Sequence, residues 1–197
     1  HGDGGRRERS SRAAHRLDVG GRWVALPPMT LCRRNHSLCE HGGFLYAAGG
    51  CPLSLPPEER YDRAVERFDG ERWVRREDVP LCAPFEQEGR PFSLQLVVCA
   101  GALHAILIGF GDADEDTAPP FALFRYDDEG GGWTRRVPTG EQPSSPQLGS
   151  PVVAHADRIL IFGQTAGGVP CVHAVLLECG RFASLPCRWL PPQELLW

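Results

Sequence analysis

Four potential metal ligands lie close together in the first quarter of the chain, where Cys32, His36, Cys39 and His41 form the pattern C-x3-H-x2-C-x-H. Zinc binds thiolates and imidazoles, and a structural zinc site would need all four side chains to converge. The segment is also typical of a short strand and its turn, in which neighbouring residues point to opposite faces of a sheet. We therefore favour ordinary strand and loop roles here, and we expect no metal ion or other cofactor.

Other catalytic patterns are absent or incomplete. All 21 basic residues are Arg, which excludes a phosphate-binding Lys and a Schiff-base Lys. No G-x-S-x-G sequence marks a nucleophilic Ser. Gly109-Phe110-Gly111 resembles half of a dinucleotide fingerprint without the helix that should follow, and the acidic residues of 112–116 lack the spacing of a calcium loop. We therefore expect no catalytic residue and no enzymatic activity.

Composition and charge limit the class of protein. The chain has 197 residues, of which 42% are hydrophobic, and its formal net charge is −4. This composition can bury a core, whereas nucleic-acid binding needs clustered positive charge, which only residues 1–12 show. No apolar run reaches the roughly 18 residues of a membrane span. We expect a disordered polar lead-in at 1–12 and a cytoplasmic location, with the nucleus as the alternative.

The 8 cysteines allow two interpretations. An even number permits a disulfide framework of the kind found in secreted proteins. Several of them lie inside apolar runs, such as Val97-Val98-Cys99. We favour reduced, buried thiols.

An internal repeat is the strongest signal in the sequence. The aromatic residues Trp23, Trp73, Trp133 and Phe182 recur after similar residues, and a Pro follows each within a few positions. An apolar or aromatic residue with an acidic neighbour precedes each aromatic, and these residues are Leu17, Phe68, Tyr126 and Leu177. Self-similarity at a period near 50 residues indicates a repeat architecture.

Short apolar strands fill the space between these aromatic residues. Residues 36–50, 94–111 and 150–164 each contain two apolar runs around a small or polar turn, ending at Gly. A third strand follows within 64–69, 121–128 and 172–178, and the fourth carries the Trp or Phe. Four short strands per unit are typical of a propeller blade, whose sheet must stack on its neighbours to bury both faces.

At these residues the sequence resembles the kelch repeat, a family of β-propellers. Gly49-Gly50 followed by Phe68 and Trp73 fits the family pattern of a double Gly, an aromatic and a Trp. The unit with Tyr126 and Trp133 fits with its glycines split, and the last unit keeps only Gly163 and has Phe182 in place of Trp. The resemblance covers residues 13–187.

The resemblance implies an all-β, incomplete kelch-type propeller. We expect three four-stranded blades at about 29–80, 90–139 and 147–187, preceded by a strand remnant and followed by an apolar tail at 188–197. Because three blades cannot close a ring, we expect the chain to be the C-terminal fragment of a longer protein.

The segments that lead into the first strand of each blade are the expected partner-binding positions. In kelch propellers this strand opens onto the binding face, and Arg suits the capture of carboxylates. The alternative is that these side chains satisfy backbone groups near the central channel. The expected residues are Arg33, Arg34, Asn35, His36, Arg90, Ser93, Gln147 and Ser150.

The family resemblance implies a protein-interaction module. If a BTB domain precedes the fragment, this part would recruit substrates to a cullin-3 ubiquitin ligase, an expectation that rests on fold analogy. The alternatives are an actin-binding scaffold and a kelch-like propeller enzyme, such as a copper oxidase or a sugar epimerase. We expect protein partners and no interaction with nucleic acid or membrane.

Overall fold

The computed structural model describes residues 11–50, 63–83, 85–86, 92–109, 121–139, 151–164, 170–177 and 180–185. Within these ranges it contains fourteen strands and no helix, which confirms the expected all-β fold. No helix of the described part is therefore long and apolar enough to cross a membrane.

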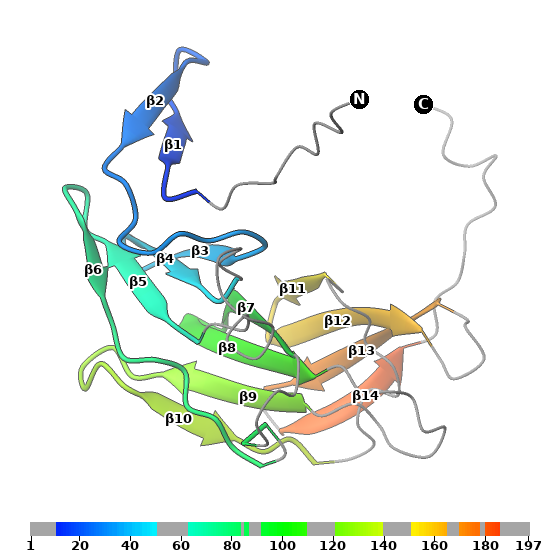
Figure 1. Cartoon of the computed structure of the whole chain (residues 1–197). Helices are drawn as coiled ribbons and strands as arrows, with labels where there is room; N and C mark the ends of the chain where they lie inside the picture. The colour runs from blue at the N-terminus through cyan, green and yellow to red at the C-terminus, as the bar shows by residue number, and fades with distance from the viewer. Residues whose placement is uncertain are drawn as a thin grey trace, which may run out of the picture.

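The strands form one two-stranded hairpin and three four-stranded antiparallel sheets (Figure 1). The hairpin pairs β1 (Ala14–Leu17) with β2 (Trp23–Leu26). In each four-stranded sheet the strands pair in chain order, so each sheet is a simple meander. The first sheet contains β3 (Ser37–His41), β4 (Phe44–Ala48), β5 (Val65–Phe68) and β6 (Trp73–Arg75).

The other two sheets repeat this arrangement. The second contains β7 (Phe92–Cys99), β8 (Ala102–Gly109), β9 (Phe121–Tyr126) and β10 (Trp133–Arg136). The third contains β11 (Val152–His155), β12 (Arg158–Gln164), β13 (Pro170–Leu176) and β14 (Arg181–Leu185). The first strand of the second sheet, β7, contacts both β3 and β11, so the three first strands lie side by side.

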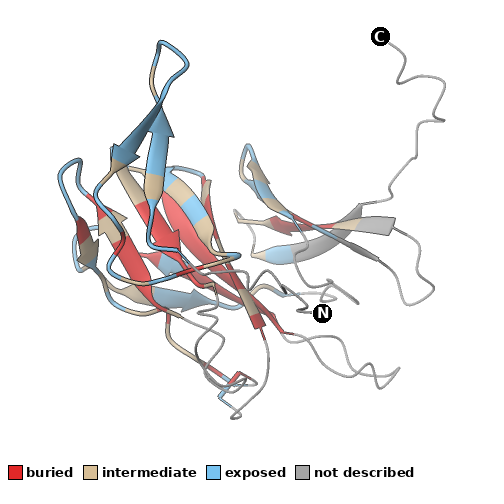
Figure 2. Ribbon diagram, turned by 45° about the horizontal axis from the view of Figure 1, so that its top comes forward, coloured by how far each residue is buried: buried red, intermediate tan, exposed pale blue. Residues whose placement is uncertain are grey.

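Apolar layers hold successive sheets face to face. One layer joins the first and second sheets and includes Tyr46, Val65 and Phe124. Another joins the second and third sheets and includes Ile106, Ile159 and Ile161. Alternate strand residues point to opposite faces, so a strand of the middle sheet can supply both layers. Accordingly every described residue of β8 is buried, and Figure 2 shows the buried strands in red.

The repeated Trp residues connect one sheet to the sheet before it. The Trp73 indole N–H donates to the carbonyl of Pro27, at 3.0 Å, and the Trp133 indole N–H donates to the carbonyl of Glu77, at 3.1 Å. Pro27 and Glu77 each lie four residues after the Trp of the preceding unit, Trp23 and Trp73. The same contact therefore recurs with the period of the repeat. Buried indole N–H groups usually find such a partner.

Trp23 differs from this pattern. Its exposed fraction is 72%, whereas that of Trp73 is 7%. Trp23 therefore does not lie between sheets in the described structure, although it holds the same place in the repeat as Trp73. The reason is local, because the β1–β2 hairpin packs on the first sheet through Leu26 and Ala14, and no described strand covers the face that carries Trp23.

The last unit also needs a correction. Phe68 pairs with Trp73 and Tyr126 pairs with Trp133, as the repeat predicts. Phe182 pairs with Val175, however, and Leu177 follows the end of β13 in a turn. The expected equivalence of Leu177 with Tyr126 is therefore shifted by two residues. A shift of two keeps the side chain on the same face of the strand, which is why alternation alone did not reveal it.

The described cysteines are free thiols. Cys82 and Cys99 are buried, Cys39 is half-buried and Cys32 is exposed. The expectation of buried thiols is thus wrong for Cys32, which lies in an irregular segment before β3 rather than in a strand. Burial raises the pKa of the Cys82, Cys99 and Cys39 thiols. These three are consequently poor nucleophiles at neutral pH.

Candidate functional surface

The segment of residues 30–36 connects the hairpin to the first sheet and carries four of the expected partner-binding residues. Asn35 is exposed, and it has a positive φ of 53°. Asn tolerates this left-handed conformation better than most residues, because its short polar side chain can bond locally. Arg34 and His36 are half-buried on either side of it. Asn35 is thus one of the exposed residues of the segment, together with Thr30 and Cys32.

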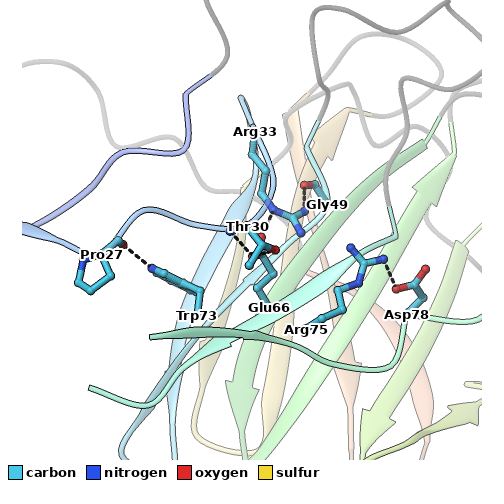
Figure 3. A network of polar contacts seen from close by, with 8 residues as sticks. All are labelled: Pro27, Thr30, Arg33, Gly49, Glu66, Trp73, Arg75 and Asp78. Carbon is cyan, nitrogen blue, oxygen red and sulfur yellow. Dashed lines mark hydrogen bonds and ion pairs between the residues drawn. The ribbon is translucent and has the colours of Figure 1, made fainter. Parts of the chain in front are cut away.

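Arg33 lies inside the molecule, in a network of polar contacts (Figure 3). Its side chain is 1% exposed, and its Nε donates to the Glu66 carboxylate at 3.1 Å. Its Nη1 donates to the carbonyl of Gly49 at 2.6 Å. For Arg33 this supports the alternative role, in which the guanidinium satisfies backbone groups. An Arg held in this way fixes the segment rather than presenting a charge to a partner.

Glu66 is the centre of this network. It lies on β5, its residue exposure is 0%, and it receives hydrogen bonds from Thr30 as well as from Arg33. The Thr30 backbone N–H donates at 2.7 Å, and the Thr30 hydroxyl donates to the same carboxylate oxygen. A buried carboxylate is tolerated only when it is paired and fully hydrogen-bonded. Glu66 therefore holds both ends of the turn between Thr30 and Arg33.

Glu66 did not emerge from the sequence as a functional residue. It stands within the short strand Val65–Phe68, where an isolated acidic residue resembles an ordinary solvent-facing position. A comparison of the repeats could have identified Glu66 as a buried position. Phe124 and His173 occupy the same register position in the other two sheets, and both are buried. A charged residue at a position that is apolar in another unit indicates a buried partner of opposite charge.

Two other expected residues carry buried polar atoms. His36 Nδ1 and Ser93 Oγ have no hydrogen-bond partner among the described residues. Burial and the nearby Arg33 guanidinium lower the pKa of His36, so its imidazole is neutral at pH 7. Gly50 lies directly against this segment, because a Cβ at Gly50 would approach the Arg34 carbonyl oxygen to 2.7 Å. Close packing thus requires Gly at position 50, the second residue of the double Gly.

The first and second sheets are joined beside this segment. The Ser37 hydroxyl on β3 accepts a hydrogen bond from the Leu96 backbone N–H on β7, at 2.8 Å. Ser93 lies three residues before Leu96 on β7. It is therefore on the strand of the second sheet that lies next to β3 of the first sheet. The remaining expected residues, Arg90, Gln147 and Ser150, lie outside the described residues.

The described residues contain no group of three His, Cys, Asp or Glu side chains that could hold a metal ion. His41, one member of the Cys and His pattern, instead pairs with Asp128 at 3.0 Å. This contact crosses from β3 to the turn after β9 and so joins two sheets. The acidic residues of 112–116 lie outside the described residues.

Comparison with known proteins identifies the fold. No protein-family model matches the chain. The solved structure of YjhT, a kelch-type propeller, matches 89% of this chain and 59% of that one, with a TM-score of 0.59 and 18% sequence identity. Kelch-like protein 36 of Mus musculus is 32% identical over 124 residues, or 61% of this chain. The described sheets have the fold of a kelch-type β-propeller.

The kelch relatives are much longer than the matched region. The match covers 18% of Kelch-like protein 36 from Mus musculus, and the same share of its counterpart from Rattus norvegicus. By their fold the four-stranded sheets described above correspond to propeller blades, and the segment of residues 30–36 leads into the first complete blade.

Proposed function

We propose that this kelch segment is a protein-recognition module and that it binds its partner through the connection of residues 30–36 and the neighbouring start of β7. The observation that carries the proposal is the Arg33–Glu66 network, which fixes a connection that includes the exposed residue Asn35. A surface segment that is ordered before binding loses less conformational entropy when it binds.

The polar character of the connection supports the same proposal. Its exposed or half-buried residues include the polar Thr30, Arg34, Asn35 and His36. Ser93 lies near the start of the adjacent strand β7. Loops held by a rigid scaffold commonly carry binding function.

We further propose that the whole protein acts as a substrate-recognition adaptor of a cullin-3 ubiquitin ligase in the cytoplasm, without enzymatic activity. The support is the similarity to Kelch-like protein 36 together with the absence of Lys in this chain. A segment without Lys cannot itself accept lysine-linked ubiquitin. Co-precipitation of the full-length protein with cullin-3 is the expected result, and no recovery of cullin-3 would contradict the adaptor role.

The binding surface is tested by affinity capture from a cell lysate with quantitative mass spectrometry. The double variant Arg34→Ala, Asn35→Ala should lose the specific partners of the wild-type chain. Arg72→Ala is the matched control, because Arg72 lies in the turn at the opposite end of the same sheet and its side chain is 80% exposed. Equal partner lists for all three proteins would contradict the proposed surface.

Two other functions have distinct readouts. An actin-binding scaffold would cosediment with actin filaments, and a copper oxidase would contain stoichiometric copper in native mass spectrometry. Tyr46 and Tyr126, two of the three Tyr residues, are buried between the first and second sheets, which makes them unsuitable as ligands at a central axis. We therefore expect neither result.

A further inference from the structure

The two interfaces between complete blades differ in their aromatic content. At the first interface Tyr46, Tyr126 and Trp133 form a cluster, with ring centroids 5.7 Å apart for the two Tyr residues and 4.9 Å apart for Tyr126 and Trp133. Arg67 lies beside it, with its guanidinium 4.0 Å from the centre of the Phe44 ring. Aromatic side chains therefore fill the part of the first interface around Tyr46 and Tyr126.

Strand register gives the equivalent residues at the second interface. Tyr46 pairs with Arg67, and His104 pairs with Arg125, so His104 takes the place of Tyr46. Tyr126 pairs with Trp133, and Val175 pairs with Phe182, so Val175 takes the place of Tyr126.

The first two strands of each blade form a hairpin, here called the inner hairpin. The residue pair next to its turn is also smaller in the second blade than in the first. This pair is His41 and Phe44 in the first blade and Cys99 and Ala102 in the second. Each of the replacements found in the described part of the second interface is therefore smaller than its counterpart.

A cavity of about 620 Å³ lies where these smaller residues meet. Its lining includes Cys99, Ala102, His104 and Val175, the four replacements derived above, together with Leu123 and Arg125. The lost aromatic volume thus explains why the cavity is present at the second interface. Its size falls within the range of about 300–1,000 Å³ that is usual for small-molecule sites.

The cavity combines an apolar wall with positive charge. Arg125, Arg135 and Arg136 line it, against a single described carboxylate, Asp157, which also lies 3.7 Å from Arg158. Burial lowers the pKa of His104, and the nearby Arg125 and Arg136 guanidiniums lower it further, so this imidazole is neutral at pH 7. Its Nδ1 donates to the Ala102 carbonyl at 3.0 Å. The net charge of the lining is therefore positive.

We propose that this cavity binds a small aromatic carboxylic acid, whose ring takes the place of the missing aromatic side chains and whose carboxylate pairs with Arg125. The ring packs on the apolar wall of Leu123 and Val175, in the place that the Tyr46 and Tyr126 rings fill at the first interface. Guanidinium groups bind carboxylates through paired, charge-assisted hydrogen bonds. The site lies between blades and is separate from the connection of residues 30–36.

Isothermal titration calorimetry with indole-3-acetate tests the proposal on the whole chain. We expect saturable binding, and binding at least about ten-fold weaker for the neutral analogue indole-3-acetamide, because the charge-assisted hydrogen bonds are lost. Arg125→Met should weaken indole-3-acetate binding by a similar factor. Arg72→Met, which changes an exposed Arg far from the cavity, should leave the affinity unchanged.

Val175→Tyr is a second variant that restores the residue found at the first interface. It should fill the cavity and abolish binding of indole-3-acetate while the protein remains folded, as judged by its circular dichroism spectrum. Absence of saturable binding to the wild-type chain would overturn the proposal. Equal affinity for the acid and the amide, or unchanged affinity in folded Val175→Tyr, would also overturn it.

Discussion

The buried pair Arg33–Glu66 shows how two side chains can fix the connection between the hairpin and the first blade. Both side chains are almost fully buried, and both make further hydrogen bonds, to Gly49 and from Thr30. A buried ion pair is weak support for stability in itself, because desolvation opposes the attraction. Removal of one partner, however, leaves an uncompensated buried charge. The pair therefore acts mainly by specifying one conformation of the connection.

Glu66→Gln should destabilise the protein by about 3–5 kcal/mol, because it leaves the Arg33 guanidinium buried without a counter-charge. Denaturant unfolding followed by circular dichroism measures the change. The double variant Arg33→Met, Glu66→Leu is the comparison, and it should be closer to wild type than Glu66→Gln. If the single variant were as stable as wild type, Arg33 and Glu66 would not form a buried pair.

The lowered pKa of His104 gives the protein a defined pH dependence. Burial places the folded-state pKa below the ordinary value of 6.5, so below pH 6.5 the unfolded chain binds more protons than the folded chain. The free energy of unfolding is therefore not reduced by His104 above pH 6.5. It decreases as the pH falls from 6.5 through the folded-state pKa of His104. His36 has a shift in the same direction.

His104→Gln should reduce the loss of stability between about pH 7.5 and pH 5 that the wild type shows. Urea unfolding at a series of pH values gives the slope for each protein. His15→Gln, at an exposed position of the hairpin, should retain the wild-type slope. A wild-type slope in His104→Gln would show that His104 is not buried in its neutral form.

At the scale of the element, the inner hairpins share one tight turn with different residues. In the first blade the turn is Gly42-Gly43, with φ values of 58° and 79°, and in the second it is Ala100-Gly101, with φ values of 50° and 72°. Two positive φ values are typical of the type I′ turns that suit the twist of a hairpin. Ala100 is strained there, because its Cβ disfavours this conformation.

Ala100→Gly should therefore stabilise the protein by about 0.5–1 kcal/mol, the net of released strain and added chain entropy. The change is measured by the midpoint of denaturant unfolding. Gly101→Ala introduces the same strain at the next position and should lower the midpoint. An identical effect of both substitutions would contradict the turn geometry.

Much of each element could be predicted from sequence, because apolar alternation and glycine-bounded turns are local signals. The predicted pairs of apolar runs at 36–50, 94–111 and 150–164 contain the turns after β3, β7 and β11. The register of β13 was not, since Val175 and Leu177 are both apolar and lie on the same face. The partners of Arg33 were also not predictable, because Gly49 and Glu66 are brought to it only by the folded sheet.

At the scale of the whole molecule, stability comes from sheets that bury each other. The repeat predicted the number of four-stranded sheets and the positions of Trp73 and Trp133. It failed at Trp23, because the environment of a residue depends on the sheet that covers it and not on its place in the pattern. The cavity at the second interface likewise depends on which aromatic residues a blade has lost.

The most direct measurement of the stacking of blades is denaturant unfolding of Trp73→Ala beside Trp23→Ala. Trp73 is buried between the hairpin and the first blade, so its truncation should cost about 3–5 kcal/mol. Trp23 occupies the same place in the repeat but is 72% exposed, so its truncation should cost less than about 1 kcal/mol. Equal losses for the two variants, or no loss for Trp73→Ala, would contradict the account.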